Sequence, residues 1–301
     1  MLMNDFKIKT VIGLFLIISQ GCTAQPLKKL VSNKDDNTLL WEVSGKGLSN
    51  PSFLYGTFHL MCKEDIHISN NLSEAIRNAD EVYFEMDLDD PANTLGAMLY
   101  INMKDGKSLK DLYTEKEYER VFNYLKDSVK LPMAMMQKIK PSFLEALLFT
   151  KLMPCKKAIG FETELMKIAK ENKKEIKGFE TMSFQASVFD SIPYEEQAKS
   201  LLKTLDSIDL YQKYFDTMLL AYKSQQIREI ELFINKKEFG MEEHKDILLY
   251  KRNRNWVDQL KNIMPGKSVF AAVGAGHLVG EQGVIELLKK EGYILRPVLN
   301  K

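Results

Sequence analysis

The sequence predicts an α/β fold in which strands from the N- and C-terminal parts form a central mixed, largely parallel sheet, with a large and mostly helical insertion between them. Three observations support this prediction. Short apolar runs ending in a histidine occur near both ends of the chain, a strand–helix–strand pattern follows the first run, and apolar residues recur at helical spacing through the middle. The chain is long enough for one large domain with a substantial core.

The N-terminal segment 1–24 has the pattern of a signal peptide. Two lysines precede the apolar run 11–18, which is too short to span a bilayer. Two cleavage sites remain open: lipoprotein processing before Cys22, which makes 1–21 the signal, or ordinary cleavage after Ala24. We therefore expect an exported protein that is either periplasmic or anchored to the cell envelope by a lipid on Cys22.

The charge balance excludes one class of partner. The formal net charge is +1, and removal of the predicted signal peptide takes away two lysines and one aspartate, which leaves zero. A neutral chain offers no electrostatic case for nucleic-acid binding. No segment identifies a partner protein.

The first half of the sheet begins with a predicted hairpin. Residues 39–44 alternate apolar and polar, a turn rich in glycine follows, and the run 53–59 reads as a second strand. Gly56 allows close backbone approach just before the chain leaves the sheet. His59 is then expected at the carboxyl end of this strand.

A helix and a further strand follow. Ser69 is a predicted N-cap for a helix over 70–78, and residues 81–88 alternate as a strand that carries Glu85. This succession predicts a right-handed crossover and a parallel neighbouring strand. It also places His59 and Glu85 at one edge of the sheet, where ligand sites of α/β folds gather.

The middle of the chain, about 108–264, is predicted to be helical, with Pro141 opening one helix and a short strand at 175–180 interrupting the run. A buried strand pattern then ends in Gly274 and His277, so both histidines lie three residues after a glycine. A helix over 284–290 and a strand over 293–298 are expected to close the sheet.

Two cysteines remain beyond the predicted signal peptide, Cys62 and Cys155. An exported pair in an oxidising compartment is expected to form a disulfide. Two separately buried thiols are the alternative.

An ordered set of short motifs spanning about residues 38–299 resembles the TraB/GumN family. That family is similar to the Tiki metalloproteases and, more distantly, to erythromycin esterases and a haem-binding lipoprotein family. The resemblance implies an α/β fold with a helical insertion and a site built from two Gly-x-x-His histidines, acidic residues and an arginine. In Tiki-like members the activity is a peptidase dependent on manganese or cobalt. The motifs are Gly56-Thr57-Phe58-His59, Tyr83 to Asp87, Gly178 to Thr181 with Gln185, Arg252-Asn253 with Trp256, and Val273 to Leu278 with Gly280.

The resemblance implies specific roles for residues of this chain. His59, Glu85 and His277 are the implied metal ligands, with Gly56 and Gly274 as the glycines of their motifs. Such a donor set suits Mn²⁺ or Co²⁺, which the family favours, and also Zn²⁺. The implied catalytic residues are Glu85, Glu180 and Arg252. Glu162 is an alternative to Glu180 as ligand or general base, Arg252 would bind an oxyanion or substrate carboxylate, and Asp87 would orient a histidine.

Each of these assignments has a structural alternative. Either histidine is also consistent with a hydrogen-bonded structural residue, Glu85 with a solvated edge strand, Glu180 with the start of a helix, and Arg252 with a surface residue like its neighbour Arg254. The sequence contains no His-Glu-x-x-His helix, so a metal is implied by resemblance alone. An exported, metal-dependent hydrolase acting on a peptide or protein is the first hypothesis. The alternative is a non-catalytic envelope protein that binds a peptide or small ligand.

Overall fold

The computed structural model describes most of the chain beyond its N-terminus. The predicted signal peptide, with Cys22, lies outside the described residues. Among the described helices, none is long and apolar enough to cross a bilayer. The described ranges are 30–31, 35–91, 100–129, 136–236 and 242–301.

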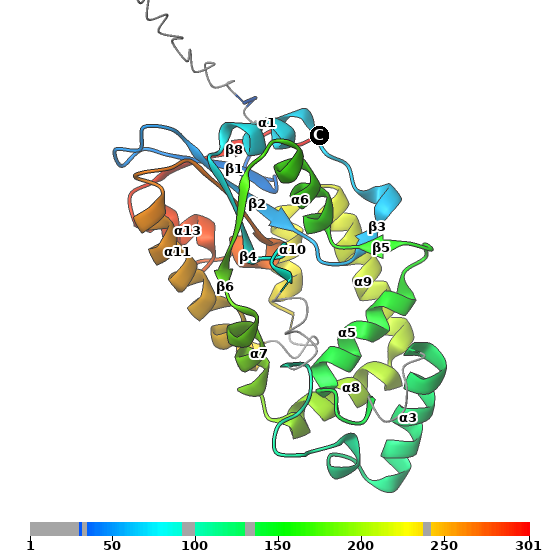
Figure 1. Ribbon diagram of the computed structural model, residues 1–301. Helices are drawn as coiled ribbons and strands as arrows, with labels where there is room; N and C mark the ends of the chain where they lie inside the picture. Colours follow the sequence, from blue (N-terminus) through cyan, green and yellow to red (C-terminus); the bar gives the residue numbers. More distant parts are fainter. Residues whose placement is uncertain (1–29, 32–34, 92–99, 130–135, 237–241) are drawn as a thin grey trace, which may run out of the picture.

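A six-stranded mixed sheet forms the upper half of the molecule in Figure 1, in the order β6-β4-β7-β2-β1-β8. Strands β6, β4, β7 and β2 run parallel, and β1 is antiparallel to both β2 and β8. The predicted fold class and the first hairpin are therefore confirmed. The strands are β1 (Leu40–Ser44), β2 (Ser52–Thr57), β3 (Met61–Cys62), β4 (Glu81–Met86), β5 (Ala158–Ile159), β6 (Glu175–Glu180), β7 (Val269–Gly274) and β8 (Ile294–Val298).

The strand order corrects one prediction. Strands β2 and β4 are parallel, but they are not neighbours, because β7 from the C-terminal part of the chain pairs with both. Local sequence reveals a crossover but not a strand that enters the sheet from a distant part of the chain. Because β7 pairs with it, β4 is an interior strand of the sheet. The alternative that Glu85 lies on a solvated edge strand is therefore excluded.

Strand β4 is shorter than the predicted 81–88, because its end bends over β6. A Cβ atom added at Gly178 would lie 2.1 Å from the backbone nitrogen of Asp87. Only a residue without a side chain allows the two backbones to come so close. The bend ends the strand at Met86, directly after Glu85.

The helices follow the predicted pattern. Ser69 caps α1 as expected, because its hydroxyl accepts a hydrogen bond from the backbone of Leu72 at 3.0 Å, and Pro141 opens α5. The described α-helices are α1 (Asn70–Asn78), α3 (Glu115–Val129), α5 (Pro141–Leu152), α6 (Phe161–Glu171), α7 (Met182–Asp190), α8 (Tyr194–Asp206), α9 (Ile208–Lys223), α10 (Ile227–Ile234), α11 (Lys251–Ile263), α12 (Ala275–Leu278) and α13 (Val284–Lys290). Short 3₁₀ turns lie at Lys63–Asp65, Leu109–Asp111 and Glu242–His244, and a π-helical turn lies at Asp246–Tyr250.

The helical insertion has a core of its own. Helices α3, α5 and α8 lie below the sheet in Figure 1 and bury a cluster that includes Val121, Leu144 and Leu201, separate from the core around the sheet. The insertion is interrupted by β6, which belongs to the central sheet, and by β5, which the sequence did not predict. Strand β5 pairs with β3 as a two-stranded ribbon.

Two buried ion pairs stabilise the two halves. In the insertion, the Lys140 ammonium lies 2.6 Å from Asp190 and is 1% exposed. In the sheet, the buried Glu81 carboxylate contacts Lys177 at 2.9 Å and also Lys267. Burial opposes ionisation of Glu81, but the hydrogen bonds from both lysines outweigh it and lower its pKa to about 2.

Candidate functional site

Three strand ends bring the predicted ligands together. His59 lies two residues beyond β2, Glu85 lies near the end of β4, and His277 lies on the short helix α12, which directly follows β7. The Nε2 atoms of His59 and of His277 each lie 3.8 Å from Oε1 of Glu85. The prediction that His59 and Glu85 share one edge of the sheet is confirmed.

Glycine keeps the meeting point open. A Cβ atom at Gly274 would lie 3.2 Å from Glu85 Oε1 and 3.2 Å from His59 Nε2, and the Gly274 amide donates a 2.8 Å hydrogen bond to the same oxygen. Gly56 has a packing role, since a Cβ there would lie 3.1 Å from the Cα of Ala275. The first glycine of each motif thus lets helix α12 or a side chain approach the strand ends closely.

His59 is oriented by Glu162, the first acid of α6. Its Nδ1 lies 2.7 Å from Glu162 Oε1, and because a carboxylate only accepts, Nδ1 carries the proton and Nε2 faces Glu85. The His59 side chain is 67% exposed. Partial burial of the ring opposes its charge, but the hydrogen bond and charge of Glu162, with the charge of Glu85, outweigh burial and raise the pKa of His59.

His277 is oriented by Asn253 on α11. The Asn253 amide nitrogen donates to the carbonyl of Gln282 at 2.8 Å, so its oxygen faces His277 Nδ1 at 2.6 Å and accepts the Nδ1 proton. This leaves the lone pair on Nε2. Burial lowers the pKa of His277 to about 3, so the imidazole is neutral at physiological pH, as a metal ligand must be.

Arg252 links the carboxylates behind the histidines. Its Nη2 donates to Glu85 Oε2 at 2.6 Å and to Glu180 at 2.8 Å, while Nε binds Glu180 at 3.0 Å. Its Nη1 donates to the carbonyl of Leu248 at 3.1 Å and lies 3.2 Å from His277 Nε2. All five N–H donors therefore have acceptors within the protein, and the surface alternative for Arg252 is excluded by its 11% exposure.

Glu180 is committed to holding Arg252. Its side chain is 1% exposed, and besides Arg252 it accepts hydrogen bonds from Trp256 Nε1 at 2.8 Å and from Gln185 Nε2 at 3.1 Å. The indole of Trp256 also stacks under the guanidinium at 4.8 Å. A carboxylate enclosed in this way positions its neighbour and does not reach a solvent-facing substrate.

Ionisation of Glu85 is well supported. Burial opposes its charge, but in the acidic range, where both imidazoles are protonated, their charges and that of Arg252, together with the Gly274 amide, outweigh burial and lower the pKa of Glu85 to about 2. The carboxylate therefore presents an anionic Oε1 to the two histidines.

Two positioning residues are not predicted as such by the sequence. Asn253 has no predicted role, although it lies in the same motif as Arg252. Glu162 is predicted as a ligand or base, whereas the structure makes it the partner of His59 Nδ1. The role considered for Asp87 falls to these two residues, and Asp87 Oδ1 instead accepts a hydrogen bond from the backbone of Asp89 at 3.3 Å. The other two histidines of the chain do not join the site, since His67 is exposed and His244 contacts Glu196 at 3.0 Å.

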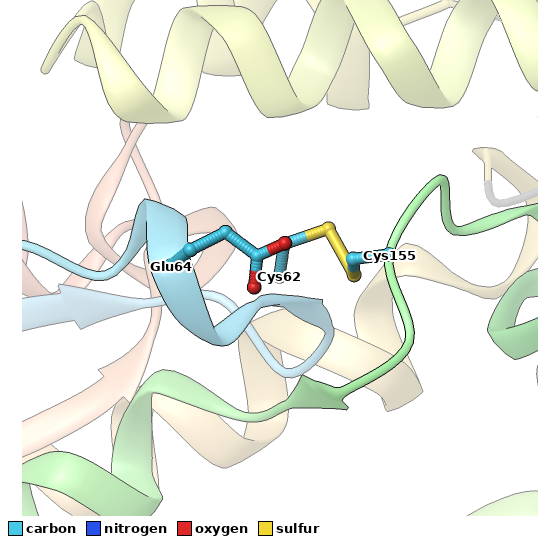
Figure 2. A group of neighbouring side chains, drawn as sticks. All are labelled: Cys62, Glu64 and Cys155. Carbon is cyan, nitrogen blue, oxygen red and sulfur yellow. A yellow bond between two sulfur atoms is a disulfide. The ribbon is translucent and has the colours of Figure 1, made fainter.

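A disulfide lies beside the site. Cys62, at the end of β3, is bonded to Cys155, and the Glu64 carboxylate lies next to the two sulfurs (Figure 2). The predicted pairing is present. It connects the segment that carries His59 to the loop that leads into β5.

The donor set fits a divalent metal. Nitrogen and oxygen ligands lie about 2.1 Å from such an ion, which places them about 3.4 Å from one another in tetrahedral geometry. The two contacts to Glu85, at 3.8 Å each, come close to this spacing. Each Nδ1 is held by an acceptor, which is the usual arrangement around metal-binding histidines.

Two other groups of donors among the described residues are closer together, within 4.8 Å. The group of Cys62, Glu64 and Cys155 has no thiolate to offer while the sulfurs are bonded, and the carboxylates of Glu196 and Glu243 are exposed to solvent. In the His59–Glu85–His277 set, the two histidines lie closer to Glu85 than to each other. The burial of Glu85 and His277, and the acceptor that holds each Nδ1, make it the better metal site.

Comparison with known proteins supports a family assignment. The model of the TraB/PrgY/gumN family matches residues 39–297. This chain belongs to the TraB/PrgY/gumN family. The match covers every strand of the central sheet except the last residue of β8, and it includes all the residues described at the site.

Among curated proteins, this TraB/PrgY/gumN member is similar to metalloproteases named Tiki. It is 22% identical to metalloprotease TIKI2 of Danio rerio, with 88% of this chain and 62% of the relative covered. It is 24% identical to TIKI1 of Danio rerio (86% and 63% covered) and 25% identical to TIKI1 of Homo sapiens (85% and 61% covered). The chain thus spans less than two thirds of the length of these relatives. No solved structure matches it.

Proposed function

We propose that this chain is an exported, divalent-metal-dependent hydrolase that cleaves peptide bonds, with His59, Glu85 and His277 as the metal ligands. The observation that carries the proposal is the convergence of both Nε2 atoms on Glu85 Oε1, with each Nδ1 held by an acceptor. The names of the distant relatives point to proteolysis. The family resemblance favours Mn²⁺ or Co²⁺, and the donor set also suits Zn²⁺.

A divalent cation at this point supplies a Lewis acid that polarises a carbonyl and lowers the pKa of water. The residues around this point orient the proposed ligands. Glu162 and Asn253 accept hydrogen bonds from the two Nδ1 atoms, so both Nε2 atoms face inward. The Nε2 of the neutral His277 carries a lone pair, whereas His59, whose pKa is raised to about 9, must lose its Nε2 proton to serve as a ligand. Glu85 keeps Oε1 directed at the histidines because Arg252 holds its other oxygen.

Arg252 has a different role here from the one the resemblance implied. A guanidinium that binds an oxyanion or a substrate carboxylate needs a free donor, and those of Arg252 are already used. We assign it to positioning Glu85 and to balancing the charges of Glu85 and Glu180. Metal binding at His277 Nε2 then requires Arg252 Nη1 to release that nitrogen, while its bond to Leu248 remains.

Metal content and peptide cleavage test this proposal. The protein is measured metal-free and after addition of Mn²⁺, Co²⁺ or Zn²⁺, beside His59→Ala and His277→Ala, with the exposed His67→Ala as matched control. We expect metal-dependent cleavage of a peptide library that both site variants abolish and the control retains. Absence of metal binding and cleavage in the folded wild type would refute the proposal.

A non-catalytic binding protein is the second candidate, and one contact favours it. Because Arg252 Nη1 lies 3.2 Å from His277 Nε2, the polar groups of the site satisfy one another without an ion. Such a protein would bind a peptide or small ligand at the same edge of the sheet without turnover. Ligand binding that persists in His277→Ala, with no cleavage by the wild type, would select this candidate.

Export and lipid attachment form a separate part of the proposal. Mass spectrometry of the protein isolated from its native membrane fraction decides it. A diacylglyceryl group on Cys22 supports an envelope anchor, and a mature N-terminus at Gln25 supports a periplasmic protein. An intact leader in all fractions would refute export.

A further inference from the structure

We propose that the Cys62–Cys155 disulfide is a redox control on the candidate site, because its state sets how firmly His59 is held against Glu162. The inference about His59 stands on the geometry of the metal-free protein. Its consequence for metal affinity rests on the function proposed above.

His59 and Glu162 belong to two segments that are far apart in sequence. His59 precedes β3 by two residues, and Glu162 is the second residue of α6, directly after β5. Their 2.7 Å contact joins positions 103 residues apart. The partner that fixes the His59 ring is therefore supplied by α6, the helix that follows the opposite strand of the β3–β5 ribbon.

The ribbon itself is small. Strands β3 and β5 pair over two residues each, Met61 with Ile159 and Cys62 with Ala158. One backbone hydrogen bond extends it at each end, from Lys63 to Lys157 at 3.0 Å and from Phe161 to Phe58 at 3.0 Å. A two-stranded ribbon of this length is marginally stable in water without further support.

Close packing transmits the state of the ribbon to His59. A Cβ atom at Gly160 would lie 3.1 Å from the carbonyl oxygen of His59 and 2.5 Å from Glu162 Oε2. Gly160, which joins β5 to α6, therefore lies close to both members of the pair. A small separation of the strands would move Glu162 away from the His59 ring.

The disulfide closes this ribbon across a loop of 93 residues. The bond restricts this loop in the unfolded chain. In the folded protein the two ends are also held by the short ribbon and by Phe161, which packs on Tyr55 of β2 at 5.2 Å. The Lys63–Glu164 ion pair at 3.8 Å also crosses between the segments, but with Lys63 51% exposed it is screened by solvent. The disulfide is the covalent tie between the two segments.

The bond is open to chemical reduction from one side. Cys62 is 3% exposed, whereas Cys155 is only partly buried, so a thiolate reductant attacks the Cys155 sulfur and releases Cys62 as a thiolate. A second thiolate of the reductant then resolves the mixed disulfide. The dithiol is oxidised to a disulfide, and the protein gains two electrons and two protons. Glu64, which lies beside both sulfurs in Figure 2, repels an anionic reductant and slows this step.

Hydrogen exchange of the metal-free full chain tests the proposal in a Cys22→Ser background, in which Cys62 and Cys155 are the remaining cysteines. Oxidised protein is compared with protein reduced by a phosphine, which is then removed, and with the Cys62→Ser/Cys155→Ser variant. We expect exchange of peptides covering 58–64 and 156–162 to accelerate at least tenfold in both disulfide-free forms. Peptides covering β7 serve as internal control and should not change.

Titration of the same proteins with Mn²⁺ and Zn²⁺ measures how the disulfide affects metal affinity. We expect about tenfold weaker metal binding without the disulfide, and no redox effect in a His59→Ala background. Unchanged exchange in the two ribbon segments overturns the inference, and so does faster exchange with identical metal affinity. If neither redox form binds metal, the proposed function fails, and the exchange result alone decides whether the disulfide holds His59.

Discussion

Arg252 and Arg254 offer a matched pair of substitutions on one helix. Arg252→Met removes a buried guanidinium that binds both Glu85 and Glu180. Arg254→Met removes a guanidinium that is 45% exposed and pairs with the exposed Asp246 at 3.0 Å. The two changes are chemically identical and lie two residues apart in α11, so their difference reports the environment of the side chain.

The magnitude follows from what each change leaves behind. Without Arg252, two carboxylates remain near each other in the interior, bridged by Gln185 at 3.4 and 3.1 Å. Breaking a buried ion pair in this way lowers the free energy of unfolding by about 3 to 5 kcal/mol. Loss of an exposed ion pair changes the free energy of unfolding by less than about 1 kcal/mol. The melting temperature of Arg252→Met should therefore be lower than that of Arg254→Met by roughly 10 °C.

Urea unfolding followed by circular dichroism measures both variants at pH 7. The double variant Arg252→Met/Glu180→Gln should recover part of the loss, because one uncompensated charge is removed. Equal stabilities of the two single variants, within about 1 kcal/mol, would refute the claim that Arg252 neutralises a buried carboxylate pair.

Three further outcomes are expected. Gly274→Ala places a methyl group 3.2 Å from two donor atoms and should weaken metal binding at least tenfold, whereas Gly266→Ala, with its nearest atom at 3.9 Å, should not; calorimetric titration compares them. The folded pKa of Glu81, about 2, is below its usual value of 4.5, so the stability it contributes is present above pH 4.5 and is lost as the pH falls toward 2. At pH 6 the free energy of unfolding of the wild type should exceed that of Glu81→Gln by up to about 3 kcal/mol. A difference that stays constant down to pH 3 would contradict this assignment. Lys140→Met removes the buried partner of Asp190, which keeps the exposed Lys104 at 2.9 Å, so the free energy of unfolding should fall by about 1 to 3 kcal/mol; a thermal melt unchanged within about 2 °C would exclude that role.

Local patterns in the sequence were sufficient for most elements of the fold. Ser69, with its short polar side chain, marks the start of α1, and the predicted spans 70–78, 175–180 and 284–290 match the structure residue for residue. The histidines were found because a glycine three residues earlier recurs in both apolar runs. These signals are local, since each depends on backbone or side-chain preferences within about ten residues.

The features that the sequence did not reveal depend on contacts between distant segments. The insertion of β7 between β2 and β4 is set by pairing between strands from opposite ends of the chain. The early end of β4 depends on Gly178 in another strand, and the β3–β5 ribbon is too short to have a periodic pattern. The roles of Glu162 and Asn253 emerge only when the histidines they hold are placed in space. The sequence offers Glu162 only as a ligand or base and Asn253 only as part of a motif, because neither pattern shows which histidine the residue contacts.

The position of β7 also determines when the sheet can assemble. Synthesis proceeds from the N-terminus, so the β1–β2 hairpin and the β4–β6 pair exist before the strand that joins them. Until residues 269–274 emerge, both pieces carry an open strand edge, and the oxygen of Glu85 has no glycine amide to hold it. A nascent chain of this protein is therefore held back from its native topology until its last strands are made. Such late closure is compatible with the proposed export, because a secretion channel accepts a chain that has not yet folded.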